Sequence, residues 1–151
     1  MTYRLLLGAL AITLGLCAQA EERSITVEYV KVYDGDTVVV RLPSLPPPLD
    51  RLRIRLEGID TPEIGKGARC AEEQVAAEAA RVYLEGLMSG SSEIRVYAFR
   101  WDKYGGRILG DLHVAEGRVR DLAVKNGFAV PYAGVGPRHD WCPPAGNPVA
   151  P

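Results

Sequence analysis

The first half of the chain alternates between hydrophobic and polar positions in a way that predicts strands. Residues 25–33 alternate, and a run rich in β-branched side chains follows at residues 38–42 after a polar turn at residues 34–36. Residues 43–48 hold four prolines, which cannot donate to a β-ladder, so this segment predicts a loop. Residues 51–56 alternate strictly, with aliphatic side chains on one face and three arginines on the other. The pattern therefore predicts a meander of three strands.

The pattern changes to a helical period in the middle of the chain. Four side chains fall three or four residues apart on one stripe: Ala76, Ala80, Tyr83 and Leu87. The opposite side carries charged residues, and a segment of serine and glycine follows at residues 89–92. The sequence therefore predicts a helix over residues 71–88 with this stripe facing the core.

Two further strands and a short helix are predicted in the second half of the chain. The strands cover residues 93–99 and 107–114 and are joined by a turn at residues 102–106. A short helix at residues 119–125 follows. Five strands with one helix between the third and the fourth is the element order of an OB-fold barrel. The predicted fold class is mainly β (α+β), a five-stranded OB-fold barrel with two to three helices.

The start of the chain differs in composition from the rest. Arg4 precedes an apolar run at residues 5–16, and residues 18–20 have the small-x-small form of a cleavage site. The run is about half the roughly 20 residues that span a bilayer, so we expect a cleaved secretory signal without a stable membrane anchor. A lipoprotein anchor through Cys17 is the alternative, although the bulky Leu16 argues against it. The predicted divisions are a signal peptide at 1–20, an OB-fold domain at 21–133 and a Pro- and Gly-rich tail at 134–151.

The charge of the exported chain is close to balanced. Without residues 1–20 it has 17 basic and 19 acidic residues, a net charge of −2. Proteins that bind nucleic acid usually carry a basic excess, because phosphates attract Lys and Arg. A site for a polyanion would therefore be a local basic patch on a nearly neutral body. We expect a monomeric protein in the periplasm or outside the cell.

Two cysteines, Cys70 and Cys142, remain after cleavage of the signal. In an oxidising compartment a lone pair of thiols usually forms a disulfide, and two separate thiols are the alternative. Only one histidine, His139, stands near either cysteine, so a zinc site has little support. His113 and His139 are expected to be ordinary residues of a strand and of the tail.

Three short segments combine acidic, hydroxyl and guanidinium groups. They are Asp-Gly-Asp-Thr at 34–37, Arg-Leu-Glu-Gly-Ile-Asp-Thr-Pro-Glu at 55–63 and Asp-Lys-Tyr-Gly-Gly-Arg at 102–107. Cleavage of a phosphodiester needs cationic help at the non-bridging oxygens, which arginine or a hard divalent ion provides. Each segment alone has an ordinary explanation, since Asp-Gly is common in hairpin turns. Taken together, the segments predict a metal-dependent phosphodiesterase.

Asp36 and Asp60 are the best candidate metal ligands. Ca²⁺ binds carboxylate and carbonyl oxygens at about 2.3–2.6 Å. Pro62 keeps Thr61 out of helical geometry and leaves the Thr61 carbonyl free to face an ion. The sequence therefore predicts a calcium site without histidine or cysteine.

The three segments, in this order, resemble the staphylococcal nuclease family over residues 25–132, and the family fold is the OB barrel. The resemblance implies a Ca²⁺-dependent endonuclease that acts on DNA, RNA or both. The implied calcium ligands are Asp36, Asp60 and the carbonyl of Thr61. The implied groups at the phosphate are Glu63, which would orient or deprotonate the attacking water, and Arg55 and Arg107, which would clamp the scissile phosphate. The implied contacts to a neighbouring phosphate and sugar are Lys103, Tyr104 and Tyr132.

The chain departs from the family pattern at Gly105-Gly106, where the best-known member has one glycine. The extra residue either forms a bulge that keeps Arg107 in place or displaces its side chain. Two other functions remain open. Residues 32–38 also fit the Asp-x-Asp-x-Thr motif of haloacid-dehalogenase-type phosphatases, which need a parallel Rossmann-like sheet. The other is a non-catalytic OB-fold module that binds nucleic acid or a protein.

Overall fold

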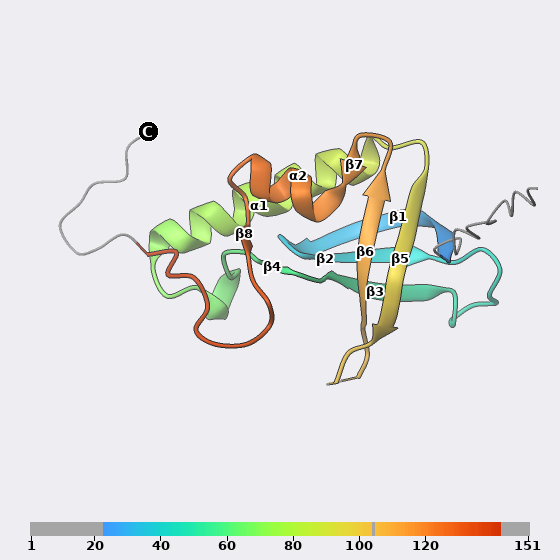
Figure 1. Cartoon of the computed structure of the whole chain (residues 1–151), viewed down its shortest axis with the longest axis horizontal. Helices are drawn as coiled ribbons and strands as arrows, with labels where there is room; N and C mark the ends of the chain where they lie inside the picture. The colour runs from blue at the N-terminus through green and yellow to red at the C-terminus, as the bar shows by residue number, and fades with distance from the viewer. Residues whose placement is uncertain (1–22, 104, 143–151) are drawn as a thin grey trace, which may run out of the picture.

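The strands form a barrel with the helices packed beside it (Figure 1). The computed structural model describes residues 23–103 and 105–142. The elements are, in chain order, β1 (Ser24–Asp34), β2 (Thr37–Arg41), β3 (Arg51–Leu56), β4 (Ile59–Asp60), the 3-10 turn η1 (Gly65–Gly67), α1 (Ala71–Ser89), β5 (Ile94–Trp101), β6 (Ile108–Val114), β7 (Gly117–Arg118), α2 (Val119–Lys125) and β8 (Val130–Pro131). Among the described residues, no helix is long and apolar enough to cross a membrane.

One parallel pairing closes the barrel. The antiparallel pairs β3–β2, β2–β1, β1–β5 and β5–β6 form a continuous sheet. β3 and β6 then pair in parallel, from Ile54 opposite Ile108 to Leu56 opposite Gly110. A Cβ on Gly110 of β6 would lie 3.1 Å from Val96 Cγ1 on β5 and 3.4 Å from Ile54 Cγ2 on β3, so glycine eases the packing of these strands. The five-stranded OB-fold barrel is therefore confirmed, and the parallel sheet that a haloacid-dehalogenase-type phosphatase needs is excluded.

Helix α1 packs against β1 and α2, and its buried stripe differs from the predicted one. The hydrophobic side chains buried along it are Ala77, Ala80, Leu84 and Met88. Tyr83 and Leu87 are only half-buried, although both pack against the core. Tyr83 stacks on Phe128, with ring centroids 4.3 Å apart. The predicted stripe was therefore wrong by one residue, and only Ala80 belongs to both.

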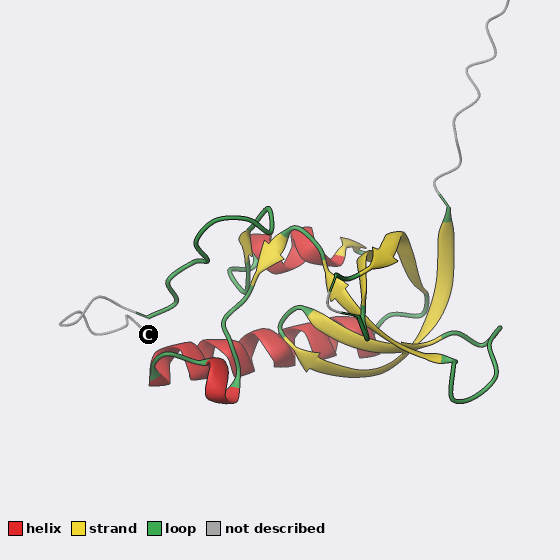
Figure 2. Ribbon diagram, turned by 90° about the horizontal axis from the view of Figure 1, so that it is seen from below, coloured by secondary structure: helices red, strands yellow, loops and turns green. Residues whose placement is uncertain are grey.

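The chain beyond the barrel returns to the start of α1. β8 pairs antiparallel with β4, and Tyr132 N donates to Gly58 O at 3.0 Å. Residues 134–142 contain no helix or strand and run toward the N-terminal end of α1 (Figure 2). There Cys142 is disulfide-bonded to Cys70, with their Cα atoms 6.0 Å apart. The irregular segment is thus attached at both ends.

Candidate active site

Close packing around Gly35 holds the turn after β1 against the segment that follows β4. A Cβ on Gly35 would lie 3.0 Å from the Cβ of Thr61 and 3.0 Å from the Cβ of Ala80 on α1. Contacts of this length are tighter than almost all real Cβ contacts, so a side chain at this position would force its neighbours to shift. The turn that precedes Asp36 is therefore in direct contact with Thr61, and both belong to the expected calcium site.

Asp36 lies just before β2 and keeps only 2% of its surface exposed. Its Oδ1 accepts hydrogen bonds from Thr37 Oγ1 at 2.9 Å and from Arg55 Nη1 at 2.7 Å. The β2–β3 register places Thr37 opposite Arg55, which brings the guanidinium to the carboxylate. Burial raises the pKa of Asp36 to about 7, and the charge of Asp34 raises it too, while Arg55 opposes both effects. Asp36 therefore needs nearby positive charge to remain ionised at neutral pH.

Asp60 is fully buried and accepts hydrogen bonds from three groups of the tail. Arg138 Nε donates to its Oδ1 at 2.6 Å. The backbone N of His139 and Nε1 of Trp141 donate to its Oδ2 at 3.1 and 3.4 Å. A buried carboxylate is costly unless it is paired, and the tail supplies the pairing. The sequence reasoning missed this role of the tail.

The guanidinium of Arg138 also reaches the rest of the acidic segment. Its Nη2 donates to the Thr61 carbonyl at 3.3 Å, and its Nη1 forms an ion pair with the Glu63 carboxylate. The backbone N of Glu63 donates to Oε1 of Glu73 at 3.2 Å, which ties this segment to α1. Three residues with expected site roles thus surround one arginine.

Glu73, in the first turn of α1, is a buried acid to which the sequence reasoning gave no role. Its Oε2 accepts from Arg69 N at 2.7 Å, in addition to the bond from Glu63. Burial alone would raise the pKa of Glu73, but the two backbone N–H groups and the charge of Arg69 outweigh burial and lower it. Cys142 Sγ lies 3.9 Å from Oε2, a contact rather than a hydrogen bond because the sulfur is in the disulfide.

A cleft of about 490 Å³ lies beside Arg55, between β3, the turn after β5 and the segment after β8. Its basic lining residues are Arg55, Arg100, Lys103 and Arg120. Arg100 and Arg120 were not predicted. Tyr132 also lines the cleft, and its hydroxyl donates to Gly136 O at 3.1 Å. Two carboxylates, those of Glu57 and Asp102, line the cleft as well, and Glu57 forms an ion pair with Arg100. The fold therefore places Lys103 and Tyr132 with Arg55 in a cleft whose lining has more basic than acidic side chains, although the whole chain is nearly neutral.

Arg107 stands apart from this group. Its Nε donates to the Asp102 carboxylate within its own turn, and it is not among the described residues that line the cleft. Gly105 and Gly106 have φ values of 70° and 71°, a conformation that favours glycine. The two glycines therefore let the chain turn tightly enough for Arg107 to reach back to Asp102. Tyr104 lies outside the described residues.

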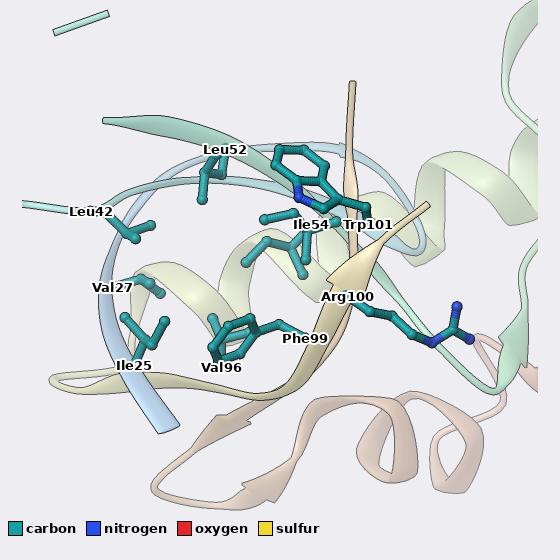
Figure 3. A pocket seen from close by; sticks show the side chains of 10 residues that line it. Ile25, Val27, Leu42, Leu52, Ile54, Val96, Phe99, Arg100 and Trp101 are labelled. Carbon is teal, nitrogen blue, oxygen red and sulfur yellow. The ribbon is translucent and has the colours of Figure 1, made fainter. Parts of the chain in front are cut away.

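A second opening, of about 360 Å³, lies at a mouth of the barrel and is almost entirely apolar. Phe99 and Trp101 of β5 stand at its rim with 42% and 69% of their surface exposed. The side chain of Arg100 points away from the apolar group (Figure 3). Since no carboxylate is among its described lining residues, this opening is not a candidate metal site.

The oxygens of Asp36, Asp60 and Thr61 have the chemistry that calcium requires. They are two carboxylates and a backbone carbonyl, the hard donors that Ca²⁺ binds in proteins. Among the described residues, one cluster of three potential ligand side chains forms, and it consists of Glu73 and the two cysteines. Both sulfurs are in the disulfide and cannot act as thiolates, so that cluster is not a metal site.

The chain matches a known protein family. A family model described as staphylococcal nuclease homologue matches residues 53–141, which is more than half of the chain. The matched range begins after Asp36 and includes Arg55, the segment from Asp60 to Glu63, and Arg138. No curated protein matches the chain.

Proposed function

The chain belongs to the staphylococcal nuclease family, and from that premise we propose that it is an exported, Ca²⁺-dependent nuclease. Its substrate would be the phosphodiester backbone of DNA, RNA or both. The observation that carries the proposal is the pairing of Arg55 with Asp36 beside the basic cleft. One guanidinium there connects a candidate metal ligand to a surface that suits a polyanion.

Asp36, Asp60 and the carbonyl of Thr61 would hold the calcium ion. Bound there, the ion would supply positive charge near the phosphate as negative charge develops on it. Arg55 donates to Asp36 through Nη1, so the rest of its planar fork can donate to phosphate oxygens. Arg107 would assist after leaving Asp102. Lys103 and Tyr132 in the cleft would bind the neighbouring nucleotide, as would Tyr104.

Glu63 would act on the water. Its carboxylate lies three residues after Asp60 and shares Arg138 with it, so the two side chains lie close together. A carboxylate in that place can orient a water molecule and accept its proton during attack on phosphorus. Glu63 must then be released by Arg138, because an ion-paired carboxylate is a weaker base.

A non-catalytic OB-fold module that binds nucleic acid or protein is the second candidate. The observation that favours it is that Asp60 and Glu63 are neutralised by Arg138, while Arg107 is bonded to Asp102. In that case the basic cleft would bind a strand without cutting it.

The test is to incubate the purified protein with labelled DNA and RNA in CaCl₂, in ZnCl₂ and in EDTA. We expect cleavage in CaCl₂, its loss in EDTA and poor replacement by zinc, which favours histidine and cysteine ligands. Binding of the nucleic acid without cleavage in any buffer would support the second candidate. Full cleavage in EDTA would contradict the calcium site.

Export belongs to the same proposal, with residues 1–20 as a cleaved signal and the folded protein as a monomer. The disulfide between Cys70 and Cys142 supports it, because such bonds persist in oxidising compartments. N-terminal sequencing of protein recovered from the periplasm or the medium should begin after residue 20 of the printed sequence.

A further inference from the structure

The segment from Pro137 to Cys142, here called the strap, is fastened across the acidic side of the site. Its end is bonded to Cys70 through Cys142. Arg69 holds its middle, since Nη2 lies 2.9 Å from Asp140 Oδ1 and donates to the carbonyl of His139 at 3.2 Å. The strap is therefore held in place by contacts independent of the acidic groups it covers.

The strap supplies donors to the same oxygens that the expected calcium site would use. Both oxygens of Asp60 accept hydrogen bonds from it, and so does the carbonyl of Thr61. Arg138 makes the central contacts, because its fork also pairs with Glu63. An ion cannot bind these lone pairs while N–H groups point at them. Occupation by Arg138 and occupation by a cation therefore exclude each other.

We propose that Arg138 is an internal counter-ion of the calcium site, which stabilises the metal-free form and must withdraw when Ca²⁺ binds. The inference rests on the proposed calcium-dependent function. Asp60 is fully buried, so its charge would be costly without a cation, and the guanidinium provides one. Arg138 keeps 41% of its side chain exposed, so it can leave toward solvent while the disulfide keeps the strap nearby.

Withdrawal of Arg138 also frees Glu63, so filling of the cation site and release of the base become one event. Binding of calcium and withdrawal of Arg138 are therefore linked equilibria. Part of the binding free energy of calcium is used to break the contacts of Arg138. The disulfide strengthens this competition because it keeps Arg138 at a high effective concentration beside Asp60. The expected consequence is a calcium affinity weaker than the same oxygens would give without the arginine.

The test is calorimetric titration of the oxidised protein with CaCl₂, for wild type and for Arg138→Gln. Glutamine removes the charge and the fork, so the dissociation constant for Ca²⁺ should fall by on the order of tenfold or more. The matched control is Arg95→Gln, which removes the same charge from a pair with Glu93 on the barrel. Arg138→Lys keeps a cation that cannot reach three acceptors at once. The calcium affinity of this variant should therefore lie between those of wild type and Arg138→Gln.

A second measurement monitors the position of the strap directly. The indole of Trp141 donates to Asp60, so displacement of the strap should shift its fluorescence on addition of CaCl₂ in a Trp101→Phe background. Equal calcium affinity in wild type, Arg138→Gln and Arg95→Gln would overturn the competition and leave the calcium site intact. Absence of calcium binding in wild type and in both Arg138 variants, with folding verified by circular dichroism, would overturn the calcium site and the competition together.

Discussion

Arg55 and Arg53 stand on the same strand but have different partners. Arg55 donates to the buried Asp36, whereas the guanidinium carbon of Arg53 lies 5.1 Å from the ring centre of Tyr33. Lysine would keep the charge at either position but lose the planar fork. Only at Arg55 does the fork join a carboxylate to the basic cleft, so only there should the fork matter for the reaction.

The first prediction concerns the substitution of Arg55 by lysine. Arg55→Lys should lower the rate of nucleic-acid hydrolysis by on the order of 10²-fold, because one ammonium cannot hold Asp36 and a phosphate oxygen in the same geometry. Arg53→Lys should lower it by less than about tenfold, since it leaves both contacts in place. Steady-state kinetics at saturating calcium compares the two variants. A similar loss of rate in both variants would show that the planar fork of Arg55 has no particular role in hydrolysis.

The residues of the site differ in how far the sequence reveals them. Asp36, Arg55 and Glu63 stand in short motifs that resemble those of the staphylococcal nuclease family, and the expected roles of Arg55 and Glu63 come from that resemblance. Arg138 is 78 residues away from Asp60 and stands in a Pro- and Gly-rich segment without a motif. Its position depends on the disulfide and on β8, and although the two cysteines are visible in the sequence, nothing there shows that they bring Arg138 to Asp60.

At the scale of elements, Glu73 connects α1 to the acidic segment, and its lowered pKa predicts a pH dependence. A carboxylate with a lowered pKa in the folded state stabilises the fold above its ordinary pKa of 4.5 and loses this effect as the pH falls. Glu73→Gln should lower the free energy of unfolding at pH 7 by about 1–3 kcal/mol. Urea unfolding at pH 7 and in acid should show this difference shrinking as the pH falls.

The exposed neighbour Glu72 provides the control for this prediction. Glu72→Gln makes the same chemical change on the same helical turn without a buried hydrogen bond, so it should change stability by less than about 0.5 kcal/mol. A deficit of Glu73→Gln that stayed constant with pH would mean that packing, not charge, explains the role of Glu73.

Gly35 tests the contact between the turn after β1 and α1. Gly35→Ala should lower stability by about 1–3 kcal/mol, because the new methyl group would crowd Thr61 and Ala80 and force them to shift. Gly86→Ala is the matched control, since Gly86 lies within α1 and a Cβ there meets nothing within 4 Å. That substitution should raise stability by about 0.5–1 kcal/mol. Thermal unfolding compares both, and a neutral Gly35→Ala would disprove the close approach.

Helices and strands could be predicted where the pattern of hydrophobic and polar residues extends over several residues. Residues 51–56 and 119–125 were predicted with the bounds that β3 and α2 have. β4, β7 and β8 have two residues each, too few for alternation to show. On α1 the buried side chains lie mostly one position further along than the predicted stripe, and Tyr83 and Leu87 beside them still pack partly buried against the core.

At the scale of the whole molecule, the disulfide closes a large loop. Cys70 and Cys142 are 72 residues apart, and on the chain-entropy model such a bond contributes about 4 kcal/mol. Reduction, or the double change Cys70→Ser with Cys142→Ser, should therefore lower the free energy of unfolding by a similar amount. Denaturant unfolding with and without reductant measures it. Unchanged stability would show that the strap is held by its other contacts.

The distribution of charge in the folded molecule differs from what the composition alone would suggest. Residues 21–151 have a net charge of −2, yet folding brings four basic side chains, from β3, β5, the following turn and α2, to one cleft that has two acidic ones. The number of charged residues in the sequence cannot show this clustering, because the clustering arises only when the barrel closes. The local patch, rather than the net charge, is what a polyanion would meet.

The central claim is that the acidic segment hydrolyses phosphodiesters with calcium, and Glu63 tests it most directly. The measurement is the rate of DNA cleavage at saturating CaCl₂ for wild type, Glu63→Gln and the exposed control Glu72→Gln. We predict a loss of roughly 10²–10⁴-fold in Glu63→Gln, the range typical of a general base, with the control close to wild type. Calcium-dependent cleavage by Glu63→Gln at the wild-type rate would contradict the account.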